Sequence, residues 1–282
     1  MITGCTKISD GCKNCYAEAM AIRFGRDFSK VVCHEEKLDE PTRWQRPRKI
    51  FVCSTSDLFH DHVPFEFIDK VFAVMAANPR HTFQVLTKRT ARMYAYLQYA
   101  TSNGYKPLPN VWIGTTIENQ NMADTRMPFL MRCEAVIRFV SIEPMIGPVD
   151  ISKYMSGCYG HLDWVIVGGE SGPAARLCLK SWVDAVVEDC KTYSVPLMFK
   201  QWGTWLPALP DCMPENTIDD CQDSCRRAID GKQTSGKSFP VTVVTAEDVA
   251  TMEGAEYYVK IGKKFSGRLI GGREYLEYPA NA

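Results

Sequence analysis

Three cysteines stand close together at the start of the chain, at Cys5, Cys12 and Cys15. A disulfide uses two cysteines, and a structural zinc site usually takes four ligands. A cubane [4Fe-4S] cluster normally takes one thiolate on each of its four irons, so three thiolates leave one iron open to bind a small molecule. The count of three therefore favours an iron–sulfur cluster with an open iron.

Other interpretations of these cysteines stay open. The pair Cys12-x-x-Cys15 is also a common half of a zinc site, or a thioredoxin-like redox pair that leaves Cys5 idle. Three buried thiols can also cluster by chance. In the zinc interpretation, the fourth ligand is one of three histidines: His34, His60 or His62.

The residues around the cysteines predict a loop that leads into a helix. The segment YAEAMAIRF, residues 16–24, has helical periodicity, so the Cys-x-x-Cys pair lies where the helix would begin. Gly4 and Gly11 precede the first two cysteines and let the backbone wrap closely around a bulky group. Such a loop fits the carboxyl end of a first barrel strand, where barrel cofactors bind.

Short apolar runs alternate with amphipathic segments over the first two hundred residues. The apolar runs cover residues 49–53, 82–86, 111–114, 137–142, 164–168 and 196–200. Helical spacing occurs between them, for example at 64–77, 89–100 and 181–193. This alternation predicts a parallel sheet covered by helices. The expected fold class is α/β, a partial TIM-like barrel of the (β/α)6 type, with an open doubly wound sheet as the alternative.

Polar residues follow the predicted strands. In both folds the active site forms at the carboxyl ends of the strands, so these side chains are candidates to line it. They include Ser54, Ser56, Asp57, Lys88, Arg89, Thr115, Glu118, Ser141, Glu143, Glu170 and Lys200.

The regular alternation ends near residue 203. We therefore predict a barrel over residues 1–203 and a C-terminal extension, residues 204–282, that packs on it. The extension contains a looser group of cysteines, Cys212, Cys221 and Cys225, at irregular intervals. Ordinary free thiols are the expected state of this group, with a second metal site as the alternative.

The composition limits the partners and the cellular location that can be expected for the protein. Thirty-three basic residues balance thirty-three acidic residues, so no global field attracts nucleic acid or a membrane. No apolar run is long enough to span a bilayer, and no secretory signal is visible. Twelve cysteines in a chain of 282 residues are expected to be mainly thiols or metal ligands, and the expected location is cytoplasmic.

Local basic segments are the places where nucleic acid would bind. Residues 43–49 carry four basic side chains around Trp44, a composition that suits phosphate contact with base stacking. The same segment suits a solvated linker before a strand. Further basic residues would enlarge the surface if the fold gathers them: Arg80, Lys88, Arg89, Arg92, Lys260, Lys263, Lys264 and Arg268.

Several blocks of this sequence resemble a phage- and prophage-associated family known as a domain of unknown function. The blocks span nearly the whole chain: GCTKISDGCKNCYAE (4–18), STSDLFH (54–60), FQVLTKR (83–89), VSIEP (140–144), DWVIVGGESG (163–172), FKQWG (199–203) and GRLIGGRE (267–274). More distantly, the first block resembles radical S-adenosylmethionine (SAM) enzymes related to spore photoproduct lyase. Those enzymes usually have three residues between the first two cysteines, whereas this chain has six.

The resemblance implies a radical SAM enzyme. Cys5, Cys12 and Cys15 would hold a [4Fe-4S] cluster, whose open iron binds SAM. An electron donor would then reduce the cluster, and the resulting 5′-deoxyadenosyl radical would abstract hydrogen from a substrate. The resemblance identifies no catalytic side chain.

The resemblance also suggests roles for the polar strand-end residues. Ser54, Ser56 and Asp57 would hold the methionine part of SAM, and Lys88 or Arg89 its carboxylate. Thr115, Glu118, Ser141, Glu143 and Glu170 would contact ribose or substrate.

Phage association and the basic segments suggest a nucleobase in DNA or RNA as the substrate, in the cytoplasm of a bacterial host. The rival interpretation is a non-enzymatic protein that zinc staples for binding nucleic acid or a partner.

Overall fold

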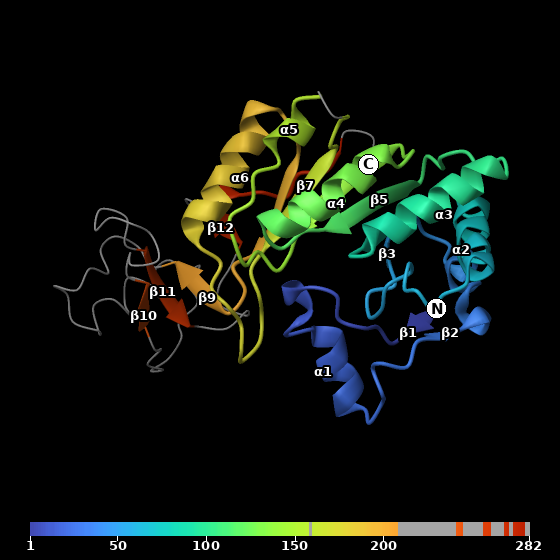
Figure 1. The fold of residues 1–282 in the computed structure, drawn as a ribbon, viewed down its shortest axis with the longest axis horizontal. Coiled ribbons are helices and arrows are strands. Elements are labelled where there is room, and N and C mark those ends of the chain that lie inside the picture. Colours follow the sequence, from blue (N-terminus) through green and yellow to red (C-terminus); the bar gives the residue numbers. More distant parts are fainter. Residues whose placement is uncertain (158–159, 208–240, 245–255, 261–267, 271–272, 280–282) are drawn as a thin grey trace.

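The structure, a computed structural model, describes residues 1–157, 160–207, 241–244, 256–260, 268–270 and 273–279 (Figure 1). Its centre is a six-stranded parallel sheet with the strands in chain order. The strands are β3 (Lys49–Val52), β4 (Thr82–Thr87), β5 (Val111–Thr116), β6 (Ile137–Ile142), β7 (Trp164–Gly168) and β8 (Leu197–Gln201). The intervening helices are α2 (Phe65–Ala77), α3 (Thr90–Ser102), α4 (Gln120–Arg132), α5 (Ser152–Met155) and α6 (Lys180–Thr192).

This topology confirms the predicted partial TIM-like barrel. A doubly wound sheet would reverse its strand order at a switch point, and this sheet has no reversal. The helices cover one face, as Figure 1 shows for α3 and α4, which lie side by side along the sheet. On that face Val85, Val140 and Val167 are fully buried in the main core, together with helix residues such as Leu97 and Val186.

The opposite face of the sheet carries its own aromatic cluster. Trp112, Phe139 and Trp164 are buried there, and the Trp164 ring centroid lies 5.6 Å from each of the other two. Trp164 begins β7 and Trp112 is the second residue of β5, so aromatic side chains fill this face near the amino ends of the strands. The carboxyl ends of the strands on this face are therefore available for a functional site.

The C-terminal segment packs against the same aromatic cluster. The Trp164 Nε1–H donates to the backbone oxygen of Glu277 at 2.9 Å, and the Tyr278 ring lies 5.2 Å from the Trp164 ring. The Lys49 ammonium, at the start of β3, lies 3.7 Å from the centre of the Tyr278 ring. The segment therefore covers the amino-terminal end of the inner face.

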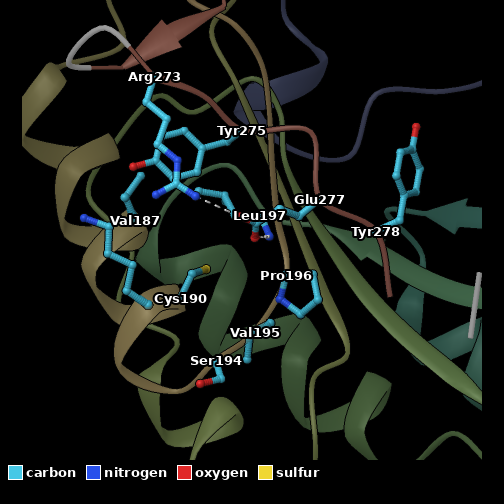
Figure 2. Close-up of a pocket in the computed structure, with 11 residues that line it drawn as sticks. Val187, Cys190, Ser194, Val195, Pro196, Leu197, Arg273, Tyr275, Glu277 and Tyr278 are labelled. Atoms are coloured by element: carbon cyan, nitrogen blue, oxygen red, sulfur yellow. Dashed lines mark hydrogen bonds and ion pairs between the residues drawn. The ribbon is translucent and has the colours of Figure 1, made fainter. Parts of the chain in front are cut away.

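Residues 273–279 also run antiparallel along β8. The Phe199 N–H donates to Tyr275 O at 2.9 Å, and the Glu277 N–H donates to Leu197 O at 3.0 Å. Figure 2 shows the cleft that this segment forms with α6 and the start of β8, where Tyr275 and Glu277 face Cys190. The cleft has a volume of about 350 Å³ and shares no lining residue with the cysteine pocket described below.

The described parts of the extension also include a small antiparallel sheet, in the order β10 (Val241–Val244), β11 (Glu256–Lys260), β9 (Trp205–Pro207). The hairpin strands β12 (Leu269–Ile270) and β13 (Arg273–Glu274) follow it. The division of the chain at residue 203 stays a prediction. Cys212, Cys221 and Cys225 lie outside the described residues. In the part of the chain that the structure describes, no helix is long and apolar enough to cross a membrane.

Candidate functional site

The chain begins beside the loop that follows β3. The short strand β1 (Ile2–Thr3) pairs with β2 (Val32–Cys33), and Gly4 forms a parallel bridge with Ser56. The Ser56 hydroxyl donates to Ile2 O at 3.0 Å. Gly4 has a φ of +84°, and a Cβ there would collide with the carbonyl of Lys30. Glycine thus allows the backbone to pass close to Lys30. The segment before Cys5 lies beside the loop after β3, but β1 belongs to a separate two-stranded sheet, so the cysteine loop does not follow a strand of the barrel as expected.

The cysteine segment then crosses the carboxyl ends of the strands. A short 3-10 helix (η1, Asp10–Cys12) and the helix α1 (Tyr16–Arg23) belong to it, and Cys15 is the N-cap of α1. The predicted loop leading into a helix is confirmed. Side chains of this segment bond to four different strand ends, so the segment is tied across the barrel mouth.

The first tie joins Thr6 to β3 and β4. The Thr6 Oγ1 lies 2.9 Å from the His60 Nε2 and accepts from the Arg89 Nη2 at 2.8 Å. The same guanidinium donates to Thr6 O at 3.1 Å. The Arg89 Nη1 also lies 3.6 Å from the Cys5 Sγ. One buried arginine therefore contacts both Cys5 and Thr6, at the start of the cysteine segment.

The second tie joins the loop between Cys5 and Cys12 to β5. The Ser9 hydroxyl donates to the carboxylate of Glu118, which is fully buried and pairs with the Arg126 guanidinium at 2.6 Å. Gly11 packs directly on this carboxylate, because a Cβ there would lie 2.5 Å from the Glu118 Cγ. The glycine predicted to allow close wrapping therefore approaches the glutamate that anchors the loop.

The third tie joins the Cys-x-x-Cys turn to β7. The Asn14 amide donates to Glu170 at 3.0 Å and to Ala174 O at 2.8 Å. Glu170 also accepts from the Arg176 guanidinium at 2.6 and 2.9 Å. Burial alone would raise the pKa of Glu170, but the hydrogen bonds from Arg176 and Asn14 outweigh it and lower the pKa below its ordinary value. The anchor is therefore an ionised carboxylate.

The fourth tie is made by Tyr16, whose hydroxyl donates to the Ser54 carbonyl after β3. Together the ties enclose a pocket with a volume of about 400 Å³. Its walls hold the three cysteines and these predicted site residues: Ser54, Ser56, Asp57, Lys88, Arg89, Ser141, Glu143 and Glu170.

Thr115 and Glu118 do not line this pocket. Thr115 is fully buried, and its hydroxyl bonds to Thr90 and to Thr87 O, so it joins β5 to β4. Glu118 faces Arg126 and Ser9, as described above. Both residues therefore hold the scaffold, because their side chains are already satisfied away from the cavity.

Asp57 is a further part of this scaffold, although it lines the pocket. Its carboxylate accepts from the Phe59 N–H at 2.9 Å and the Thr87 hydroxyl at 2.7 Å, and it lies 3.5 Å from the Arg89 guanidinium. These bonds fix the loop after β3 against the end of β4. They also place a negative charge near Cys5.

The electrostatic setting of Cys5 favours the thiol over the thiolate. Burial, followed by the nearby Asp57 carboxylate, raises the pKa of the Cys5 thiol, and the Arg89 guanidinium opposes this shift in part. A metal that binds Cys5 would therefore release its proton. This environment does not promote reaction of the free thiol as a nucleophile.

The three cysteines and the polar side chains of the pocket are the candidate donors for a cofactor. Among the described residues, no three His, Cys, Asp or Glu side chains gather closely enough to hold one metal ion. The three cysteines instead lie around the walls of one pocket. In two other pocket-lining side chains, the buried atoms Arg89 Nε and Gln201 Oε1 have no hydrogen-bond partner. The walls therefore offer the thiols of the cysteine segment and polar groups with unused bonding capacity. A fourth thiol, Cys53 after β3, also lines the pocket, but burial raises its pKa to about 12, so it stays protonated.

Lys200, near the carboxyl end of β8, also lines the pocket and donates to Glu143 at 2.8 Å. Its strand-end position made it a candidate from the sequence. Three other residues of the site, Asn14, Ser9 and Tyr16, were not singled out from the sequence. Their roles in tying the cysteine segment depend on partners far away in the sequence.

Several of the basic side chains noted in the sequence already have partners within the fold. Arg80 donates to Thr42 O at 2.9 Å and to Trp44 O at 3.1 Å, while Arg92 donates to Val63 O at 2.8 Å. Arg89 is buried in the site. Lys263 and Lys264 lie outside the described residues, and so do the side chains of the neighbouring strand.

Protonation of His60 is expected to destabilise the fold. Its Nδ1 accepts from the His62 N–H at 3.1 Å, so Nε2 carries the proton and donates to Thr6. Burial, and then the nearby Arg89, lower the pKa of His60 below 6.5. The unfolded chain therefore binds this proton more readily. The stabilisation is complete above pH 6.5 and is lost as the pH falls from there through the folded pKa.

Thermal unfolding between pH 8 and 5 checks this expectation. The Tm of the wild-type protein should fall more steeply below about pH 6.5 than that of His60→Gln, which has no group to titrate. Equal pH dependence in the two proteins would show that His60 contributes nothing to it.

The fold and the site together define the class: a partial TIM-like barrel protein with three cysteines held at the carboxyl ends of its strands. The chain belongs to the DUF5131 family, described as a protein of unknown function, whose family model matches residues 1–279. No curated protein and no solved structure matches the chain. No named relative therefore supports the phage or the radical SAM resemblance.

Proposed function

We propose that the protein is a radical SAM enzyme in which Cys5, Cys12 and Cys15 hold a [4Fe-4S] cluster. The observation that carries this proposal is the pocket itself. A segment with three cysteines is tied across the mouth of a partial barrel, facing polar strand ends. Barrel enzymes bind cofactors at this end, and three thiolates are one fewer than a cubane cluster normally takes.

The shared pocket supports binding of both cofactors. Cys5, Cys12 and Cys15 line a cavity with a volume of about 400 Å³, together with side chains that can donate and accept hydrogen bonds. When bound, the cluster and SAM would supply a 5′-deoxyadenosyl radical that takes a hydrogen atom from a carbon of the substrate. The chain's own residues would bind and orient these groups and exclude water.

Lys88 is the residue proposed to bind the carboxylate of SAM. It lines the pocket, and its ammonium makes no ion pair among the described residues. The Ser54 and Ser56 side chains lie at the adjacent strand end and are proposed to bind the amino group. Arg89 is less suited to bind the carboxylate, because its guanidinium already bonds to Thr6 and lies beside Asp57.

Glu143 and Lys200 are proposed to face the substrate. Ser141 lies near the carboxyl end of β6 and Glu143 directly follows this strand; both line the pocket, where Lys200 pairs with Glu143. Because the pair is partly exposed to solvent, a polar substrate can replace either partner at little cost. Glu170 and Glu118 would act indirectly, by holding the turns that carry the cysteines.

The proposed substrate is a nucleobase in DNA or RNA. Arg43 and Arg46 are exposed on either side of Trp44 and make no ion pair among the described residues. The Arg48 guanidinium lies 4.6 Å from the centre of the Trp44 ring. Cations next to an aromatic ring suit phosphate contact and base stacking, which supports this choice.

Reductive cleavage of SAM tests the proposal. Protein reconstituted anaerobically with iron and sulfide, then reduced with dithionite, is expected to convert SAM into 5′-deoxyadenosine and methionine, measured by mass spectrometry. Cys12→Ala treated identically is the control for cleavage by free iron and sulfide. If the wild-type protein cleaves no more SAM than this control, and binds one zinc and no iron, the result would instead support a binding protein stabilised by zinc.

A further inference from the structure

The helix that follows Cys15 presents apolar side chains to solvent. Figure 1 shows α1 apart from the helices α2 to α6 that cover the sheet. We call the exposed apolar residues on and beside this helix the α1 surface: Ile8 (43% exposed), Tyr16 (60%), Met20 (46%), Ile22 (68%) and Phe24 (64%). Tyr16, Met20 and Phe24 recur every four residues and so share one side of this segment, and a group of exposed apolar side chains of this kind marks an interaction site.

Unpaired cations surround the α1 surface. Four exposed basic side chains make no ion pair among the described residues: Lys13, Arg23, Arg26 and Lys30. Of the nearby acidic groups, Glu18 is paired with Lys7 at 2.7 Å, while Asp10 and Asp27 keep their negative charges. Five basic residues (Lys7, Lys13, Arg23, Arg26 and Lys30) therefore outnumber three acidic ones over residues 7–30. The whole chain has equal numbers of acidic and basic residues, so this excess is local. It would attract a partner with an acidic surface.

The α1 surface is continuous with the cysteine pocket. Cys15 is the N-cap of α1, and Tyr16 belongs both to the surface and to the pocket wall. The Tyr16 hydroxyl is fixed to the Ser54 carbonyl, which holds the ring in place between the two. A protein docked on this surface would sit next to a proposed cluster ligand.

We propose that the α1 surface docks a small acidic protein that carries single electrons, with a flavin or an iron–sulfur centre. This inference rests on the proposed function, since it requires the cluster. One electron leaves the reduced carrier, which is oxidised, and enters the cluster, which is reduced. No atom passes between the two proteins.

An acidic protein fits this surface better than a nucleic acid. Aliphatic side chains, Met20 and Ile22, make up much of its apolar area together with Phe24. An apolar centre of Met and aromatic residues within a charged rim is typical of protein–protein interfaces. Single-stranded nucleic acid would instead need successive aromatic rings along a cationic groove.

Reduction kinetics test the inference. The variants are Ile22→Asp and Arg23→Glu, both at exposed positions outside the pocket. Stopped-flow absorbance follows reduction of the reconstituted cluster by reduced flavodoxin, and separately by dithionite. We expect each variant to react about tenfold more slowly with flavodoxin, because steering and docking are lost. Dithionite, a small molecule, should reduce all proteins at the same rate.

Matched controls lie far from the cysteines. Val136→Asp and Arg132→Glu make the same chemical changes at exposed positions after and within α4, and should leave the flavodoxin rate unchanged. The wild-type rate should also fall with added salt.

Three results would overturn the inference. If flavodoxin reduces the cluster of both variants at the wild-type rate, the α1 surface is not the docking site. Weaker binding of a fluorescent single-stranded oligonucleotide, with unchanged reduction, would assign the α1 surface to nucleic acid. A wild-type protein that takes up no iron would overturn the proposed function and this inference together. If the protein instead binds the cluster and dithionite reduces it, the flavodoxin rates test the docking surface alone.

Discussion

Replacement of Cys5, Cys12 or Cys15 by alanine is expected to abolish the iron–sulfur cluster. Each removes one of the three thiols that the cysteine segment brings to the pocket, and a cluster held by two thiolates would be lost to solvent. The fourth thiol of the pocket, Cys53, is a poor replacement, because burial raises its pKa to about 12. Iron and sulfide per chain after anaerobic reconstitution should fall from about four each to near zero, and the visible absorption should disappear.

Two core cysteines provide matched controls. Cys133 and Cys190 are buried in the hydrophobic core, where burial raises the pKa of each thiol to about 12. Their alanine variants should bind the full complement of iron, because a buried neutral thiol is not a metal ligand. A Cys5→Ala protein with wild-type iron content would refute the ligand assignment, and the six-residue gap before Cys12 makes Cys5 the most informative of the three.

Replacement of Glu118 by alanine is expected to destabilise the protein by about 3–5 kcal/mol, since it leaves the Arg126 guanidinium buried and unpaired. It also frees Ser9 and the loop that lies between Cys5 and Cys12. Denaturant unfolding measures the first effect, and iron uptake of the folded variant measures the second.

Two further variants separate the effects of Glu118. Ser9→Ala keeps the buried ion pair and removes only the tie to the loop, so it should weaken iron retention with a small loss of stability. Glu143→Ala breaks the partly exposed pair with Lys200 and should cost about 0–1 kcal/mol. A Glu118→Ala protein as stable as Glu143→Ala would contradict the anchoring role.

Hydrophobic patterning was sufficient to predict the barrel. The runs at 82–86 and 164–168 became β4 and β7 to within one residue, because strands buried on both faces need continuous apolar sequence. The strand-end rule likewise brought Lys88, Ser141 and Glu143 to one pocket, since parallel strands end at the same edge of the sheet.

The same rule could not separate pocket residues from anchors. Glu118 follows a strand just as Glu143 does, but Ser9 and Arg126 claim its carboxylate. Ser9 and Glu118 are 109 positions apart, and no spacing pattern links them. The cationic residues 80, 89 and 92 show the same limit, because spacing could not predict their hydrogen bonds to backbone carbonyls and to Thr6.

The most direct test of the central claim is the electron paramagnetic resonance spectrum of the reduced, reconstituted protein with and without SAM. An iron with no protein ligand is open to SAM. We therefore expect a [4Fe-4S] signal whose g-values shift when SAM is added. In Lys88→Ala, higher concentrations of SAM should be needed to produce the same shift. A colourless protein with stoichiometric zinc, or a cluster signal that SAM leaves unchanged, would contradict the central claim.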